Sequence, residues 1–166
     1  MSVKARIGMF VGIVCTALMS LIAAPGAAFA ATCYNYGCDG TNPDYMPWNG
    51  SAVTRLGPIT NGGGFSIALR SGTANGSVYA WARMTYSSGS DEHLRYVSIE
   101  RCSKDFMQCT SGLGTKAGGT AGWSGKVADT ANTYATWSGV YYDSGLVSRA
   151  CVYDSVTGNY TCTGWW

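Results

Sequence analysis

The chain has few charged residues and a single histidine. Of its 166 residues, 12% are Asp, Glu, Lys or Arg, and the formal net charge at neutral pH is +2. A charge this small excludes proteins whose affinity for nucleic acid or acidic membranes depends on neutralising many phosphates. Proline is also scarce, with four residues, and the 13% aromatic content argues against a disordered chain.

Charge is absent from one long stretch near the N-terminus, residues 7–24. Lys4 and Arg6 precede this apolar run, and Ala28-Phe29-Ala30 follows it with the small-x-small pattern that signal peptidase recognises. We therefore predict a signal peptide at residues 1–30. A membrane anchor is the alternative, but the small-x-small ending favours cleavage.

Cleavage leaves residues 31–166, which we predict to form one secreted domain, long enough to bury a core. Loss of Lys4 and Arg6 brings the basic residues to nine, equal to the nine acidic ones. No second apolar stretch of membrane length follows. We therefore expect an extracellular location, no nucleic-acid partner, and no membrane partner after cleavage.

Cleavage also removes Cys15 and leaves an even number of cysteines, which in an exported chain predicts a disulfide framework. Many pairings are formally allowed, but the clustering in sequence favours three local bridges. The candidates are Cys33, Cys38, Cys102, Cys109, Cys151 and Cys162. Zinc is the competing interpretation, disfavoured by the single histidine and the lack of a Cys-x-x-Cys pair.

The C-terminal cysteines lie in a predicted hairpin. The turn-rich residues 154–158 connect the two strands of this hairpin. If the chain folds back symmetrically about the middle of this turn, Tyr153 lies opposite Tyr160 and Cys151 lies opposite Cys162. Opposed strand residues have Cβ atoms close enough for a disulfide. A one-residue bulge in the turn would change this register. The same folding brings Cys102 opposite Cys109 across a six-residue loop.

Strand periodicity extends over much of the rest of the chain. Residues 77–86 alternate Val78, Ala80, Ala82 and Met84 with Tyr79, Trp81, Arg83 and Thr85. Residues 94–101 alternate in the same way, and turn signals separate the runs. The pattern predicts an all-β fold, a small antiparallel β-sandwich or barrel stapled by local disulfides. Glycine-rich residues 110–130 are expected to form a long loop.

Three short segments resemble a family of small secreted actinobacterial domains known only as a domain of unknown function. The segments are Cys33…Gly37-Cys38-Asp39-Gly40-Thr41-Asn42-Pro43, Ala68-Leu69-Arg70 and Trp81-Ala82-Arg83-Met84. The resemblance covers residues 33–86 and implies a bacterial origin. Two further cysteines usual in that family are absent here, so its disulfide pattern is not transferred. The family implies no catalytic residues.

Candidates for catalysis or metal binding are weak. His93 lies at the start of a predicted strand beside Asp91 and Glu92, where a surface position is expected rather than a general base. Ser124 lacks the final glycine of a nucleophile elbow. The stretch from Asp39 to Asp44 offers oxygen ligands at short spacing, as calcium prefers, but an Asx turn explains it. We therefore assign no catalytic residue, no metal and no cofactor.

Aromatic residues are in clear excess, with six Trp and eleven Tyr. Flat rings with polar groups suit sugar rings or a protein partner. Adjacent pairs cannot both face one core in an extended strand. Tyr79, Trp81 and Tyr96 are expected to serve as packing residues on the faces of the sandwich. The ligand-binding candidates are Tyr34, Tyr36, Trp48, Trp137, Tyr141, Tyr142, Trp165 and Trp166.

Three function classes remain. A non-catalytic domain that binds cell-wall or environmental polysaccharide explains the export, the disulfides and the surplus aromatics, and we favour it. A secreted inhibitor of proteases or other hydrolases is the alternative; it would present Lys104, Phe106 and Met107 on the loop closed by Cys102 and Cys109. A small secreted hydrolase comes third, because no nucleophile–base pair is evident.

Overall fold

The computed structural model describes residues 33–61, 64–87, 91–127 and 132–166, and the predicted signal peptide at 1–30 lies outside these residues. Within them, the helices are single short 3₁₀ turns, and none is long and apolar enough to cross a membrane.

The elements in chain order are η1 (Asn35–Cys38), η2 (Pro43–Tyr45), β1 (Val53–Asn61), β2 (Phe65–Ala74), β3 (Ser77–Ser87), η3 (Glu92–Leu94), β4 (Arg95–Ser103), β5 (Cys109–Ala117), β6 (Ser124–Lys126), β7 (Thr133–Trp137), β8 (Tyr141–Tyr142), β9 (Leu146–Asp154) and β10 (Asn159–Cys162).

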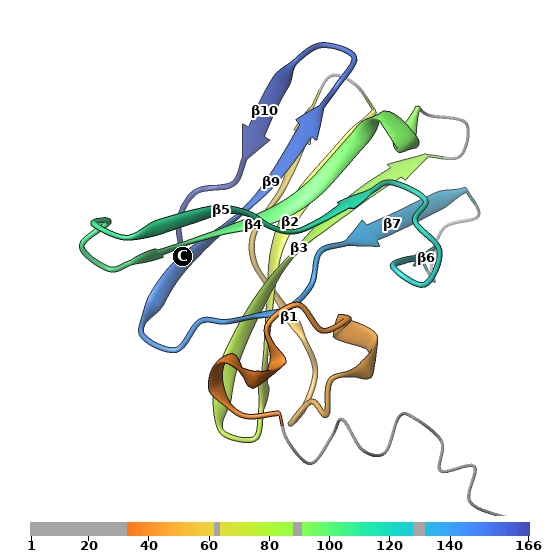
Figure 1. Ribbon diagram of the computed structural model, residues 1–166. Helices are drawn as coiled ribbons and strands as arrows, with labels where there is room; N and C mark the ends of the chain where they lie inside the picture. The colour runs from red at the N-terminus through yellow and green to blue at the C-terminus, as the bar shows by residue number, and fades with distance from the viewer. Residues whose placement is uncertain (1–32, 62–63, 88–90, 128–131) are drawn as a thin grey trace, which may run out of the picture.

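The strands form two antiparallel sheets, which confirms the small all-β fold (Figure 1). One sheet has six strands in the order β1-β2-β3-β7-β6, with β8 also pairing with β3. The other has four strands in the order β10-β9-β4-β5 and lies in front of the first in Figure 1. The C-terminal half of the chain therefore supplies all four strands of the front sheet.

The main core lies between the two sheets and follows the predicted alternation. On β3, Ala82 and Met84 face inward, and on β4, Val97 and Ile99 do so. Each of these side chains is fully buried. Burial of a Val, Ile or Met side chain contributes about 1.5–3 kcal/mol, so the inward positions fix the register of both sheets. The remaining members are Phe65, Ile67, Leu69, Ala80, Tyr86, Ala150 and Val152.

All three predicted disulfides are present and join Cys33 to Cys38, Cys102 to Cys109, and Cys151 to Cys162. The β9–β10 ladder runs without a bulge, with Cys151 directly opposite Cys162 and their Cα atoms 4.1 Å apart. The predicted hairpin register is therefore confirmed. Three disulfides in one small chain indicate an oxidising environment.

The prediction of a long loop at residues 110–130 is wrong, because β5 occupies the start of this range and β6 lies within it. β5 is an edge strand whose pairing with β4 is interrupted by register shifts. Gly112 and Gly114 have φ values of +66° and +60°, a left-handed conformation that glycine adopts without strain. An edge strand faces solvent and tolerates such interruptions, so it lacks the alternation used to predict strands.

A second, smaller core lies on the outer face of the six-stranded sheet, under the N-terminal segment at residues 33–52. Tyr79 and Trp81 are buried there, as expected for packing residues, rather than between the sheets. Trp48 stacks on Trp81 with ring centroids 5.1 Å apart. Gly72 leaves room for the Trp48 ring, since a Cβ at this position would lie 2.6 Å from it.

Candidate functional site

Three tyrosines form a row across the outer face of the four-stranded sheet. Tyr153 on β9 is paired in register with Tyr96 on β4 and with Tyr160 on β10. Ring centroids are 6.4 Å apart between Tyr96 and Tyr153 and 6.3 Å apart between Tyr153 and Tyr160, with planes tilted by 35° and 42°. Val97 and Ile99 take the inward positions of β4, so Tyr96 faces outward.

The tyrosine row lines an open groove of about 450 Å³. Tyr153 is 40% exposed and Tyr160 is 50% exposed, so both rings are accessible from solvent. The other lining residues are small or carry hydroxyl groups, and none is charged: they are Ser98, Gly112, Thr115 and Ser155. The groove therefore offers flat apolar rings and neutral hydrogen-bonding groups without a formal charge.

Covalent and hydrogen-bonded contacts hold the groove in place. The next cross-strand pair on the same face as Tyr153 and Tyr160, two residues along, is the Cys151–Cys162 disulfide. On the other side of the row, the Ser155 hydroxyl donates to the Leu94 carbonyl at 2.7 Å. The backbone that carries the three rings is thus held in place before a ligand binds, which reduces the conformational entropy lost on binding.

The sequence-derived aromatic candidates are distributed over other parts of the molecule. Trp48 and Trp137 anchor the N-terminal segment through their indole N–H groups, which donate to the Pro43 carbonyl and to Asn42 Oδ1, each at 2.9 Å. Both rings pack against the smaller core and are partly buried.

A second group of these candidates surrounds Arg101 beneath η1. Its guanidinium lies 5.2 Å from the Tyr36 ring and 5.6 Å from the Tyr141 ring, and its Nη1 is 2.9 Å from Asp39 Oδ2. Tyr142 packs on Tyr36 with centroids 4.7 Å apart. Burial raises the pKa of Tyr141 above its ordinary value. This cluster joins the N-terminal segment to β4 and β8.

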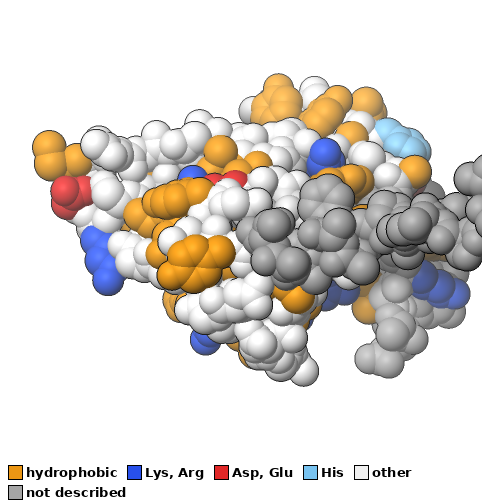
Figure 2. All heavy atoms as spheres, turned by 60° about the horizontal axis from the view of Figure 1, so that its bottom comes forward, with side chains coloured by type: hydrophobic (Ala, Val, Ile, Leu, Met, Phe, Trp, Pro, Cys, Tyr) orange, Lys and Arg blue, Asp and Glu red, His pale blue; other side chains and the backbone are white. Residues whose placement is uncertain are grey.

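The most exposed aromatic side chains belong to the N-terminal segment. Tyr34 is 65% exposed, Tyr36 57% and Tyr45 71%. Figure 2 shows the molecule from the side that carries this segment, with hydrophobic side chains in separate patches among mostly uncharged ones. Tyr34 directly precedes η1, Tyr36 lies within it and Tyr45 lies in η2, whereas the three tyrosines of the groove form an ordered row across one sheet.

The two C-terminal tryptophans face different surroundings. Trp166 packs against the main core, and the Arg55 guanidinium covers its ring at 4.6 Å. Trp165 lies under the Arg149 guanidinium, also at 4.6 Å, and contacts Phe106 edge-on with centroids 5.3 Å apart. Both tryptophans are thus partly covered by other side chains, and neither is fully exposed.

The loop closed by Cys102 and Cys109 protrudes at the end of the β4–β5 hairpin (Figure 1). Met107 is 83% exposed at its tip. The loop turns back on itself, and its N–H groups donate inside the loop: Phe106 to the Ser103 carbonyl at 2.9 Å, Met107 to Asp105 Oδ1 at 3.1 Å, and Gln108 to Ser103 Oγ at 3.1 Å.

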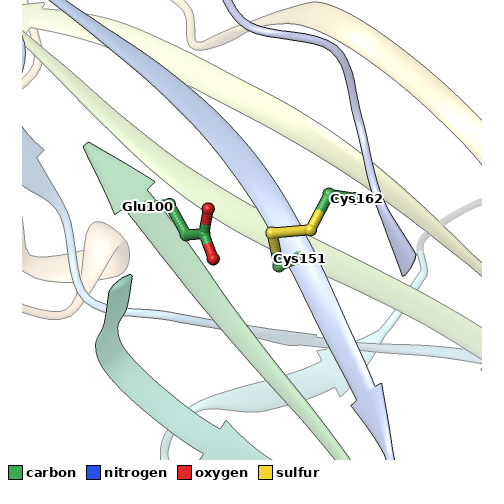
Figure 3. Close-up of side chains that lie close together, drawn as sticks. All are labelled: Glu100, Cys151 and Cys162. Atoms are coloured by element: carbon green, nitrogen blue, oxygen red, sulfur yellow. A yellow bond between two sulfur atoms is a disulfide. The ribbon is translucent and has the colours of Figure 1, made fainter. Parts of the chain in front are cut away.

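One cluster among the described residues combines a carboxylate with cysteines: Glu100, Cys151 and Cys162 (Figure 3). The two sulfur atoms are joined in a disulfide and therefore offer no thiolate to a metal. The Glu100 carboxylate accepts from Arg149 Nε at 2.7 Å. This cluster is a cross-strand brace rather than a metal centre.

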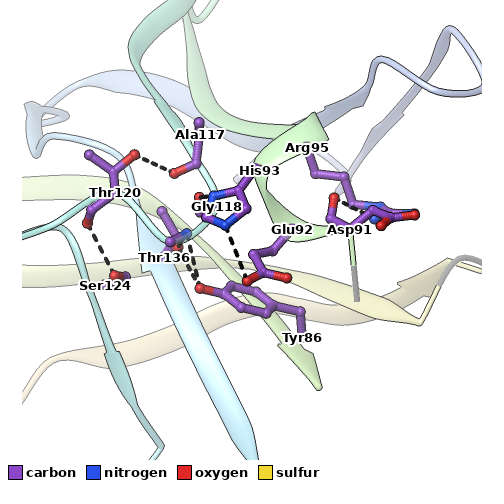
Figure 4. A network of polar contacts seen from close by, with 11 residues as sticks. Tyr86, Asp91, Glu92, His93, Arg95, Ala117, Gly118, Thr120, Ser124 and Thr136 are labelled. Carbon is purple, nitrogen blue, oxygen red and sulfur yellow. Dashed lines mark hydrogen bonds and ion pairs between the residues drawn. The ribbon is translucent and has the colours of Figure 1, made fainter. Parts of the chain in front are cut away.

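His93 lies at the surface in a network of backbone contacts (Figure 4). Its side chain is 75% exposed, and its Nε2 is 3.6 Å from Glu92 Oε1. Nδ1 is 3.1 Å from the Gly118 carbonyl. Ser124 donates its hydroxyl to the Thr120 carbonyl at 3.1 Å. The surface position expected for His93 is confirmed, and these contacts hold η3 against the segment after β5.

The predicted Asx turn is also present. Asn42 Oδ1 accepts from the Asp44 N–H at 3.0 Å and so caps η2. The Asp39 carboxylate binds Arg101 and accepts from the Tyr142 N–H at 2.6 Å. The side-chain oxygens of Asn42 and Asp39 therefore have partners within the chain.

No family model, curated protein or solved structure matches the chain. The resemblance to the actinobacterial domain family stays a prediction.

Proposed function

We propose that this chain is a secreted, non-catalytic domain that binds an uncharged polysaccharide in the groove lined by Tyr96, Tyr153 and Tyr160. The observation that carries the proposal is the ordered row of three rings, two of them exposed, in a groove lined by no charged residue. Flat rings bury the C–H faces of sugars, while tyrosine and serine hydroxyls hydrogen-bond to sugar hydroxyls.

The shape of the groove favours a polymer over a small molecule. Small-molecule sites are concave and bury most of their ligand. This groove is open and crosses β4, β9 and β10 along one row of rings. A linear chain can lie across such a row and contact each ring with successive sugars. The disulfides agree with a domain that works outside the cell.

The test is retention of the purified protein on insoluble cellulose, chitin and peptidoglycan. We expect saturable binding to one of these polymers and about tenfold or more weaker binding for Tyr153→Ala/Tyr160→Ala, since the change removes two stacking contacts. Tyr34→Ala/Tyr45→Ala is the matched control, because it removes two exposed tyrosines outside the groove. A thermal melt of each variant confirms folding.

Two outcomes contradict the proposal. Retention on none of the polymers removes its basis. Equal loss of retention in the groove variant and in the control variant shows that any exposed tyrosine contributes to retention, and that the groove has no special role.

The inhibitor alternative has one supporting observation, the protruding disulfide-closed loop with Met107 at its tip. Peptide segments that bind along an extended enzyme cleft offer free backbone N–H groups for strand-like pairing. Here the N–H groups of Phe106, Met107 and Gln108 are already bonded inside the loop. We therefore favour the polysaccharide, and an inhibition assay against a panel of secreted proteases tests the alternative.

A further inference from the structure

Two neighbouring arginines lie on the outer face of the six-stranded sheet. Arg70 on β2 is paired in register with Trp81, and Arg83 on β3 is paired with Ala68. The two arginines are thus diagonal neighbours on one face, and side chains of their length can reach a common point. Both are partly buried.

Neither arginine forms an ion pair with a carboxylate among the described residues, whereas three other arginines do. Those pairs are Arg95 with Asp154 at 3.5 Å, Arg101 with Asp39 at 2.9 Å, and Arg149 with Glu100 at 2.6 Å. Arg70 and Arg83 therefore differ from the three paired arginines: they are partly buried without a carboxylate from the described part of the chain to balance the charge.

The hydrogen bonding of Arg70 is also incomplete. Its Nη2 donates to the Ala52 carbonyl at 3.0 Å, but its Nε is buried without a hydrogen-bond partner among the described residues. A buried donor without an acceptor costs free energy, and more so on a charged group. Burial lowers the pKa of both arginines, and repulsion from Arg83 lowers that of Arg70 further.

We propose that Arg70 and Arg83 form a binding site for one anionic group with several oxygens: a carboxylate, sulfate or phosphate. Guanidinium groups bind such anions through paired N–H donors, and the diagonal placement of Arg70 and Arg83 on adjacent strands allows both to reach one anion. The anion would relieve the repulsion between the two charges. The site lies on the other sheet from the tyrosine groove, so it stands or falls independently of the proposed polysaccharide binding.

Anion titration of the purified protein tests the proposal. Sodium sulfate and sodium phosphate are added at constant ionic strength, with sodium chloride as the balancing salt. Trp81 and Trp137 lie beside the arginines in register, so tryptophan fluorescence reports binding. We expect a saturable change with either anion. Arg83→Gln should weaken it about tenfold or more, since hydrogen bonds to a charged group are lost.

Arg83→Gln is the primary variant because no hydrogen bond or ion pair joins the Arg83 side chain to another described residue, so the substitution leaves no internal partner of the guanidinium unsatisfied. We expect it to melt no lower than the parent without anion.

Arg55→Gln on the neighbouring strand is the matched control and should keep the fluorescence response. If sulfate raises the melting temperature of the parent and of Arg83→Gln equally, the proposal is overturned, because such an effect comes from general exclusion of the salt from the protein surface. An unsaturable response also overturns it.

The source of the anion is distinguished by a second arm. Retention on immobilised polygalacturonate, lost in Arg83→Gln, supports a carboxylate carried by a polymer. Saturable binding of phosphate or sulfate without retention on the polymer supports a free ion. Failure of both overturns the site and leaves the tyrosine groove untouched.

Discussion

Tyr153 and Tyr160 lie directly opposite each other on β9 and β10, with ring centroids 6.3 Å apart. Tyr96 continues the row on β4, which is distant in sequence but paired with β9 in register. The row exists only when all three strands hold their register. The same register forms the Cys151–Cys162 bridge, so the brace of the hairpin and the binding surface depend on one arrangement of the backbone.

Binding in the tyrosine groove should be insensitive to salt, because no residue that lines it is charged. Between about 50 and about 500 mM sodium chloride, we expect the affinity for the retained polymer to change less than about twofold. Depletion isotherms at both salt concentrations measure this. An affinity that falls steeply with salt contradicts groove binding and directs attention to the arginine pair on the other sheet.

Loss of the Cys151–Cys162 disulfide should lower the free energy of unfolding by about 3 kcal/mol, the value expected for closing a loop of this length. Cys151→Ala/Cys162→Ala should accordingly melt several degrees lower than the parent, and polymer binding should weaken because the hairpin carries Tyr153 and Tyr160. Calorimetry in the absence of reductant measures the first effect. An unchanged melting temperature would contradict the bracing role of this bridge.

The disulfides and the central strands could be predicted because local sequence determines them. A short hairpin places Cys151 opposite Cys162 by symmetry alone, and alternation along β3 and β4 assigns each residue to a face. β5 could not be predicted in this way, since its glycines and register shifts remove the periodic pattern. Edge strands depend on the neighbour that they pair with, and sequence does not identify that neighbour.

The sequence does not predict the groove, for the same reason. It predicts a packing role for Tyr96, and neither Tyr153 nor Tyr160 is among the ligand-binding candidates that it offers. Tyr96 joins the row through the pairing of β4 with β9, a contact between residues far apart in the sequence. Adjacent pairs such as Trp165 and Trp166 were more visible in the sequence. The one available signal was the predicted opposition of Tyr153 and Tyr160 in the hairpin.

The ion pair of Arg95 and Asp154 should contribute strongly to stability. The two side chains are 9% and 5% exposed, and Arg95 also lies over the Phe65 ring. Asp154→Asn keeps an oxygen for the Val156 N–H but leaves the Arg95 charge without compensation. We expect a loss of about 3 kcal/mol, typical of breaking a buried pair from one side.

Urea unfolding measures the effect of Asp154→Asn. The matched control is Glu92→Gln, which removes the partner of the exposed His93 and should cost less than about 1 kcal/mol. Equal effects of the two substitutions would show that burial does not strengthen the Arg95–Asp154 pair.

Asp143 should make the protein less stable as the pH rises from about 4 to about 6. Burial raises the pKa of this carboxyl from 3.8 to about 6, partly offset by the Ser148 hydroxyl and by Arg101. In this pH window the folded state keeps a proton that the unfolded state has released. The free energy of unfolding therefore falls by about 3 kcal/mol across the window and levels off above it.

Asp143→Asn removes this titration and still offers an oxygen to the Ser148 hydroxyl, which donates to Asp143 Oδ1 at 2.6 Å in the parent. Urea unfolding of both proteins at several pH values gives the difference between them. Because other carboxyls titrate equally in both, that difference isolates Asp143. We expect the variant to gain relative stability as the pH rises through the window, with a plateau at neutral pH. A difference that is constant with pH would show that Asp143 keeps an ordinary pKa despite its burial.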